Sequence, residues 1–105
     1  MENIPEKDWK HLYSLKDILV DRFSEQTLSN ITKIINSNNP NRPHEKYLKI
    51  YRYLEKRDYI LGDDLSDFRR SNALYKILGI KRLGLFTDEE FEGFSEEIKK
   101  FYEKF

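Results

Sequence analysis

Residues 57–76 read RDYILGDDLSDFRRSNALYK, and this stretch decides whether the middle of the chain is one long helix or two. An apolar residue occurs at every seventh position in this stretch, and the same spacing begins before residue 57. The row consists of Tyr47, Leu54, Leu61, Phe68 and Tyr75. A row that keeps its phase over four heptad steps is typical of a coiled-coil-like helix. The pattern therefore predicts a helix that continues through the stretch.

Gly62 is the feature of this stretch that opposes a continuous helix. A glycine inside a helix costs about 1 kcal/mol relative to alanine. The alternative is a break, in which Gly62 ends one helix and Asp63 or Asp64 caps the next. Because a break usually resets the hydrophobic phase, we expect one helix from Pro43 to about Arg82, roughly 60 Å long at 1.5 Å per residue.

Upstream of the stretch, the sequence predicts a second long helix and a loop. Apolar residues recur every three or four positions from Trp9 to Phe23 and, after a step of five, again from Leu28 to Ile35. This indicates an amphipathic helix that starts near Pro5, with a kink or a rotation of its apolar face near Ser24. The segment NSNNPNRP, residues 36–43, contains four Asn and two Pro and predicts a loop. The two long helices are therefore expected to run antiparallel as a hairpin.

Downstream, Gly84 is expected to end the preceding helix, and Thr87 with Glu90 has the spacing of a capping box. One helix should follow, or two short ones if Ser95 starts a second cap. The predicted fold class is all-α: a long antiparallel helical hairpin plus a short C-terminal helix. We expect this three-helix, coiled-coil-like bundle to be a single domain over residues 1–105.

The chain contains no Cys, so it has no disulfide and no thiolate metal site. Its first residues, MENIPEKDWK, lack the apolar segment of a secretory signal. No apolar run approaches the roughly 20 residues that span a bilayer. We therefore expect a cytoplasmic protein that does not bind membranes.

Charge is unevenly distributed, although the chain is neutral overall. Residues 1–41 sum to −1, residues 42–82 to +5 and residues 83–105 to −4. One interpretation is that the acidic C-terminal segment packs near the basic middle and neutralises it. The alternative is a basic nucleic-acid-binding surface over residues 42–82. Because dedicated nucleic-acid-binding domains are usually basic overall, we favour neutralisation.

The charged residues of the opening stretch suggest two kinds of site. Asp63, Asp64 and Asp67 form a DDxxD pattern, in which carboxylates could bridge Mg²⁺ to a diphosphate, as in prenyl-chain synthases. Such enzymes need a large helical cavity and a second acidic motif, so we interpret the aspartates as helix caps or as ion-pair partners, such as Asp67 with Arg70. A basic stripe for nucleic acid could be formed, beside Tyr75, by Arg69, Arg70, Lys76, Lys81 and Arg82.

His11 and His44 are the histidines of the chain, and they lie on different predicted helices. A catalytic histidine needs a nucleophile or a carboxylate held close by, so we expect both side chains at the surface. No glycine-rich phosphate loop, GxSxG or HExxH motif is present. We therefore predict no catalytic, cofactor-binding or metal site, no cofactor and no enzymatic activity.

An interaction surface is the function class that the sequence favours. The apolar edge of the second long helix is longer than its neighbours can cover, and Asp58 and Asn72 are set into it as polar residues that can fix register or oligomeric state. The candidate interface consists of Tyr47, Tyr51, Leu54, Asp58, Leu61, Leu65, Phe68, Asn72 and Tyr75. We expect a homodimer, or an unidentified protein partner, and an interaction or regulatory role.

Four segments carry a resemblance to known proteins. They are EKDW (6–9), PHEKYLKIY (43–51), DDLSDFRRSNAL (63–74) and LGLFTDEEFEGFS (83–95). Together they resemble a widespread family of small uncharacterised bacterial all-helical proteins, a domain of unknown function. LGLFTDEEF is also similar to short C-terminal oligomerisation modules of bacterial proteins. The resemblance implies a bacterial, cytoplasmic, helical protein, and it implies no activity and no functional residue.

Overall fold

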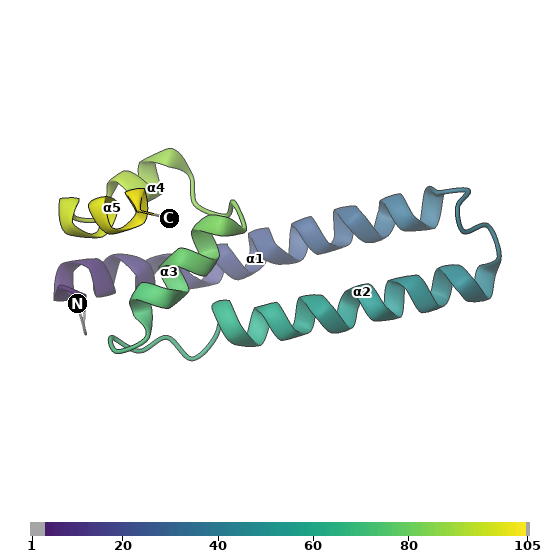
Figure 1. The fold of residues 1–105 in the computed structure, drawn as a ribbon, viewed down its shortest axis with the longest axis horizontal. Coiled ribbons are helices and arrows are strands. Elements are labelled where there is room, and N and C mark those ends of the chain that lie inside the picture. Colours follow the sequence, from purple (N-terminus) through teal and green to yellow (C-terminus); the bar gives the residue numbers. More distant parts are fainter. Residues whose placement is uncertain (1–3, 105) are drawn as a thin grey trace.

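In the computed structural model, residues 4–104 are described, and over that range the chain is helical without any strand. The helices are α1 (Glu6–Asn36), α2 (Pro43–Asp64), α3 (Ala73–Arg82), α4 (Asp88–Glu92) and α5 (Glu96–Glu103). The all-α fold class is thereby confirmed. Figure 1 shows α1 and α2 as a long hairpin, with the shorter helices gathered at the end where both termini lie.

The hairpin forms where the loop sequence predicts it. α1 ends at Asn36, and Pro43 occupies the first turn of α2, where its missing N–H costs no hydrogen bond. Lys46 reaches back across the loop, and its Nζ donates to the carbonyl oxygens of Ile35 at 2.8 Å and Ser37 at 2.9 Å. The positive charge of Lys46 at this position also interacts favourably with the negative, C-terminal end of the α1 dipole.

The expected continuous helix from Pro43 to Arg82 is wrong, because α2 ends at Asp64. Gly62 lies inside the helix, so the alternative break at Gly62 is wrong as well. Local hydrogen bonds make the turn instead: Asn72 Oδ1 accepts from the Arg69 N–H at 3.0 Å, and Asn72 Nδ2 donates to the Asp67 carbonyl at 2.9 Å. Asp67 has a left-handed backbone conformation, with φ 54°, which ends any helical path.

Because α2 ends at Asp64, the following helix can pack against α1 and form the core. α3 leaves the line of α2 and crosses α1 (Figure 1), and α4 and α5 close over the same region. Twelve buried apolar side chains form this core: Ile4, Leu12, Leu19, Phe23, Leu65, Ala73, Ile77, Ile80, Leu85, Phe94, Ile98 and Tyr102. None of them belongs to α2. We call this end of the molecule the head, and the hairpin projects from it.

The C-terminal segment follows its capping sequence closely. The Glu90 N–H donates to Thr87 Oγ1, and Glu90 Oε1 accepts from the Thr87 N–H, which confirms the capping box. Ser95 caps α5 by accepting from the Ile98 N–H, so the segment is two short helices, the second of the two expected arrangements. Gly84 follows α3 with φ 71°, as the predicted end of that helix.

We expect Gly62→Ala to stabilise the protein. A Cβ at Gly62 meets no atom within 4 Å, so alanine adds helix propensity without a clash, a gain of about 0.5–1 kcal/mol. Gly84→Ala is the matched control, and its left-handed backbone should make the same change cost about 1–2 kcal/mol. Urea unfolding of the two variants measures both effects, and a loss of stability in Gly62→Ala would contradict the prediction.

Candidate interaction surface

Exposed apolar side chains gather on one side of the α1–α2 hairpin. On α1, Leu28 is 64% exposed and Ile35 52%; on α2, Tyr47 is 64% and Tyr51 54% exposed. We call this side the hairpin face and define it by Tyr13, Val20, Ser24, Leu28, Ile31 and Ile35 of α1 and Tyr47, Tyr51, Leu54, Asp58 and Leu61 of α2. Steps of three, four and seven residues keep each set on one face of its helix.

A shared groove shows that the two sets lie on the same side of the hairpin. It has a volume of about 230 Å³ and runs between the helices at mid-length. Ser24 and Leu28 line it from α1, and Leu54, Asp58 and Leu61 line it from α2. The groove is therefore the middle of a single surface to which both helices contribute.

Arg57 joins the two helices at this groove. Its Nε donates to Thr27 Oγ1 at 2.8 Å, its Nη2 donates to the Phe23 carbonyl at 3.1 Å, and its guanidinium lies 3.8 Å from the centre of the Phe23 ring. The contact with the ring is a cation–π interaction, which is worth about 0.5–2 kcal/mol depending on solvation. Arg57 therefore holds α2 to α1 at the last buried turn of α1.

The other side of the hairpin is polar. Asn30 Nδ2 lies 2.7 Å from the Tyr53 hydroxyl, and helical periodicity places the exposed Lys33, Lys49 and Lys56 around this pair. The hairpin thus has two unlike sides, and only one of them carries a run of exposed apolar side chains.

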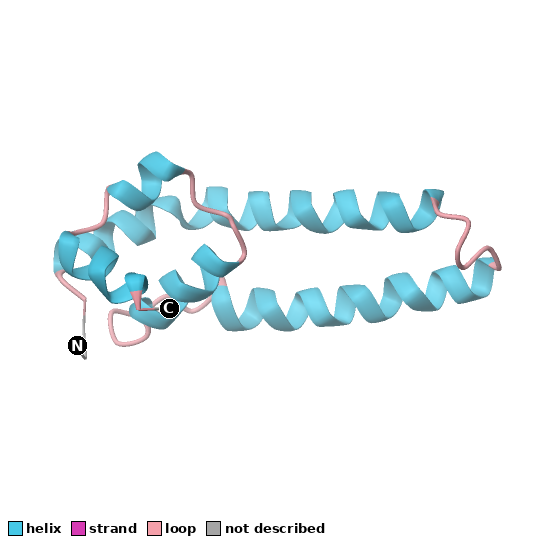
Figure 2. Cartoon of the chain, turned by 45° about the horizontal axis from the view of Figure 1, so that its top comes forward, coloured by secondary structure: helices cyan, strands magenta, loops and turns pink. Residues whose placement is uncertain are grey.

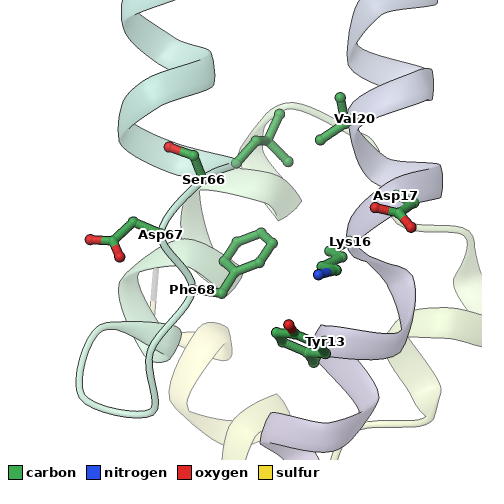
Figure 3. Close-up of a pocket in the computed structure, with 8 residues that line it drawn as sticks. Tyr13, Lys16, Asp17, Val20, Ser66, Asp67 and Phe68 are labelled. Carbon is green, nitrogen blue, oxygen red and sulfur yellow. The ribbon is translucent and has the colours of Figure 1, made fainter.

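A second hollow lies at the head end of the hairpin face. It has a volume of about 330 Å³, and α1 lines it with Tyr13, Lys16 and Val20. Figure 3 shows Phe68 projecting into it from the loop after α2, opposite Tyr13. Lys16 Nζ lies 4.1 Å from the centre of the Tyr13 ring. Two aromatic rings on opposite walls, with a cation beside one of them, make this a hollow suited to another aromatic side chain.

The residues of the sequence-predicted interface form a continuous edge of α2 in the first half of their range, but not in the second. Tyr47, Tyr51, Leu54 and Asp58 are exposed on α2, and Leu61 is half-buried in the groove. The remaining members leave the edge because α2 ends at Asp64. These are Leu65, which is buried in the core, Phe68 and Asn72, which lie in the loop, and Tyr75, which is exposed on α3.

Sequence reasoning missed the α1 half of the surface. Leu28, Ile31 and Ile35 have helical spacing, which suits burial in a bundle as well as it suits an exposed stripe. These residues would be buried only if a third long helix covered them. Whether the chain provides such a helix depends on where α2 ends.

The DDxxD aspartates do not converge on one point. Asp63 and Asp64 end α2, whereas Asp67 lies in the loop and pairs with Arg69 at 2.6 Å, not with the expected Arg70. Burial raises the pKa of Asp64, and the neighbouring Asp63 charge raises it further. Within residues 4–104, no group of three or more His, Asp or Glu side chains could hold a metal ion.

Several basic residues after this motif make internal contacts, which does not favour the alternative of a basic stripe for nucleic acid. Lys76 is buried and its Nζ donates to the Asp63 carbonyl at 2.5 Å, while Arg70 Nη2 donates to the Ile4 carbonyl at 3.0 Å. Lys81 Nζ lies 3.9 Å from the centre of the Phe91 ring. Three of the five cations of the predicted nucleic-acid surface therefore hold the head together.

Polar contacts fasten α4 and α5 to α1. Arg22 forms a two-pronged ion pair with Glu90 at 2.5 and 3.0 Å, and its Nη1 also donates to the Leu85 carbonyl at 2.9 Å. The hydrogen bond from Arg22 lowers the pKa of Glu90 below its ordinary value. The fully buried Asp8 accepts from both the N–H and the hydroxyl of Ser95, at 2.8 and 2.7 Å.

These contacts correct one expectation from the sequence and add detail to another. His11 is half-buried, with its Nε2 2.6 Å from the Glu90 carbonyl oxygen, and is not a surface histidine; His44 is exposed and stacks on Tyr47. The ion pairs described for the acidic C-terminal segment are made by Arg22 and Lys99, and neither residue belongs to the basic middle segment. The segment nevertheless packs beside the basic middle, because the Tyr102 hydroxyl donates to the Leu74 carbonyl and Lys81 lies over the Phe91 ring.

Comparison with known proteins returns no match among family models, curated proteins or solved structures. The resemblance to a bacterial family therefore stays a prediction. None of the helices in the described part of the chain has the length and apolarity needed to cross a membrane. The function proposed below therefore rests on the geometry of the hairpin.

We expect the ion pair of Glu90 to contribute to stability in a pH-dependent way. Because the folded-state pKa of Glu90 is lowered, its contribution is fully present above the unfolded pKa and is lost as the pH falls through the folded pKa. Glu90→Gln should cost about 1.5–3 kcal/mol at neutral pH, the range for hydrogen bonds to charged groups. This cost should shrink as the pH falls from the unfolded pKa of Glu90 through its lower folded pKa.

Denaturant unfolding at several pH values measures this difference between the native chain and Glu90→Gln. The exposed Glu103 offers a control, since Glu103→Gln removes a carboxylate of the same segment without removing an ion pair. If Glu90→Gln lowers the free energy of unfolding by the same amount at pH 7 and pH 3, the Arg22–Glu90 pair is not the source of that loss.

Proposed function

We propose that the protein is a non-enzymatic interaction module that self-associates through the hairpin face. The observation that carries the proposal is the one-sided distribution of exposed apolar residues, from Leu28 and Ile35 on α1 to Tyr47 and Tyr51 on α2. Scattered exposed apolar residues need no explanation, but a continuous run on one side of an element is typical of an interaction site.

The surface area of the chain supports the same proposal. A monomer of 12.8 kDa is expected to expose about 6,300 Å². The chain exposes 7297 Å², an excess of about 1,000 Å² that reflects its 51 × 25 × 23 Å shape. One protomer of a standard interface buries about 800 Å². Association of two copies through the hairpin would therefore bring the exposed area per chain to that of an ordinary globular monomer.

Chemistry on the hairpin face favours a protein partner. Leucines line its central groove together with Ser24 and Asp58. Tyrosines, which are enriched at protein interfaces, lie at the tip. Burial of this apolar surface stabilises a complex by roughly 25 cal/mol for each Å² removed from water, before the cost of association. A non-enzymatic module needs no more than such a surface held in a fixed shape, and the Arg57 contacts hold it.

We expect a dimer in size-exclusion chromatography coupled to light scattering at tens of micromolar, with a mass twice 12.8 kDa. Tyr51→Glu should convert it to a monomer, because a charge would be buried without a partner. Tyr59→Glu is the matched control: Tyr59 is another exposed tyrosine of α2, 80% exposed, but lies away from the hairpin face.

A native chain that is monomeric under these conditions would overturn the proposal. So would equal loss of the dimer in both tyrosine variants, because that result would place the contact outside the hairpin face. Circular dichroism of each variant establishes that the helices are intact before the masses are compared.

A further inference from the structure

We infer that the second copy packs antiparallel across the hairpin face and places Tyr51 in the hollow between Tyr13 and Phe68. This inference rests on the proposed self-association and specifies its geometry. The hollow is then a site completed by the partner copy, and each dimer contains two of them, because a two-fold interface repeats every contact.

The two ends of the hairpin face have complementary shapes. At the tip, Tyr47 and Tyr51 project with 64% and 54% of their surface exposed. At the head end, the hollow of about 330 Å³ has the rings of Tyr13 and Phe68 on its walls (Figure 3). A protruding end and a hollowed end of one surface meet each other only when the second copy is reversed.

The spacing of these features along the helices agrees with a two-fold axis at the central groove. The Asn30–Tyr53 and Thr27–Arg57 contacts set the pairing of the helices, which places Tyr51 beside about residue 33 of α1. Counted from a midpoint near residue 26, Tyr51 and Tyr47 lie roughly 10 and 16 Å toward the tip. The hollow is lined by α1 from Val20 to Tyr13, so it extends roughly 9 to 20 Å toward the head, a range that includes both distances.

The same register pairs large side chains with small ones along α1. An axis near residue 26 brings Leu28 of one copy opposite Ser24 of the other, and Ile35 opposite Asp17. Ser24 lines the groove and is the smallest side chain there, so it leaves room for the exposed Leu28. Large residues that face small ones are the arrangement in which helix layers interdigitate.

Charge is also self-complementary at the midpoint. Arg57 and Asp58 line the groove together, so each copy presents one positive and one negative group close to the axis. A two-fold rotation brings the Asp58 carboxylate of one copy toward the Arg57 guanidinium of the other, and the reverse. A parallel arrangement lacks the match of tyrosines with hollows, because it places tip on tip.

The chain contains no native Cys, so introduced cysteines give an unambiguous test. A Tyr51→Cys chain is mixed with a Ser66→Cys chain, since Ser66 lines the hollow, and a short bismaleimide is added. We expect a cross-linked species of twice the chain mass. Tyr51→Cys alone should not cross-link, because its two copies lie roughly 20 Å apart in this register.

A second pair keeps Tyr51 in place, in case its loss weakens the dimer. Asp17→Cys mixed with Ile35→Cys should cross-link, because these residues face each other across the axis. Ile18→Cys mixed with Ile35→Cys is the control, since Ile18 is exposed but turned away from the hairpin face. Light scattering of each variant shows whether the dimer is still present.

The outcomes separate this inference from the proposal on which it rests. A dimer that cross-links through Tyr51→Cys alone is parallel, and a dimer in which neither mixed pair cross-links uses another register; both results overturn the inference and leave self-association standing. A monomeric native chain overturns both. Cross-linking of both mixed pairs, without cross-linking of the control, supports the antiparallel arrangement.

Discussion

A two-helix hairpin has no third element to cover it once it leaves the head, and the rest of the structure depends on this constraint. Among residues 4–104, every buried apolar residue of the core lies in or beside the head, and α2 contributes none between Pro43 and Asp64. Figure 2 shows α2 beside the C-terminal part of α1, with the shorter helices confined to the end where α1 begins. The distal hairpin must therefore be held by polar contacts or be covered by another molecule.

The polar contacts can be assigned to particular residues. Arg57, Asn30 and Lys46 link α1 to α2 along the hairpin, and each makes specific hydrogen bonds that fix the pairing of the helices. Such bonds set register well but contribute only about 0.5–1.5 kcal/mol each. The apolar side chains between them stay partly exposed, so the hairpin is well defined in shape while part of its apolar surface is still in contact with water.

The sequence predicted what is local and failed where the answer depended on distant contacts. The loop before Pro43, the capping box at Thr87 and the helix end at Gly84 are all set by neighbouring residues, and all three are confirmed. The end of α2 was not predictable from phase, because the heptad row continues through a loop. Its cause is the burial of Leu65 and of α3 against α1, and an Asn72 side chain that completes the turn.

The break after Asp64 links the core of the head to the shape of the hairpin face. It places Leu65 in the core, and three residues later it places Phe68 on the wall of the hollow. A continuous helix would have carried both along a straight edge and left no hollow beside Tyr13. The hairpin face has two unlike ends because α2 stops where it does, and a surface with unlike ends has a direction. The turn that completes the core would therefore also determine the orientation of the second copy that we propose.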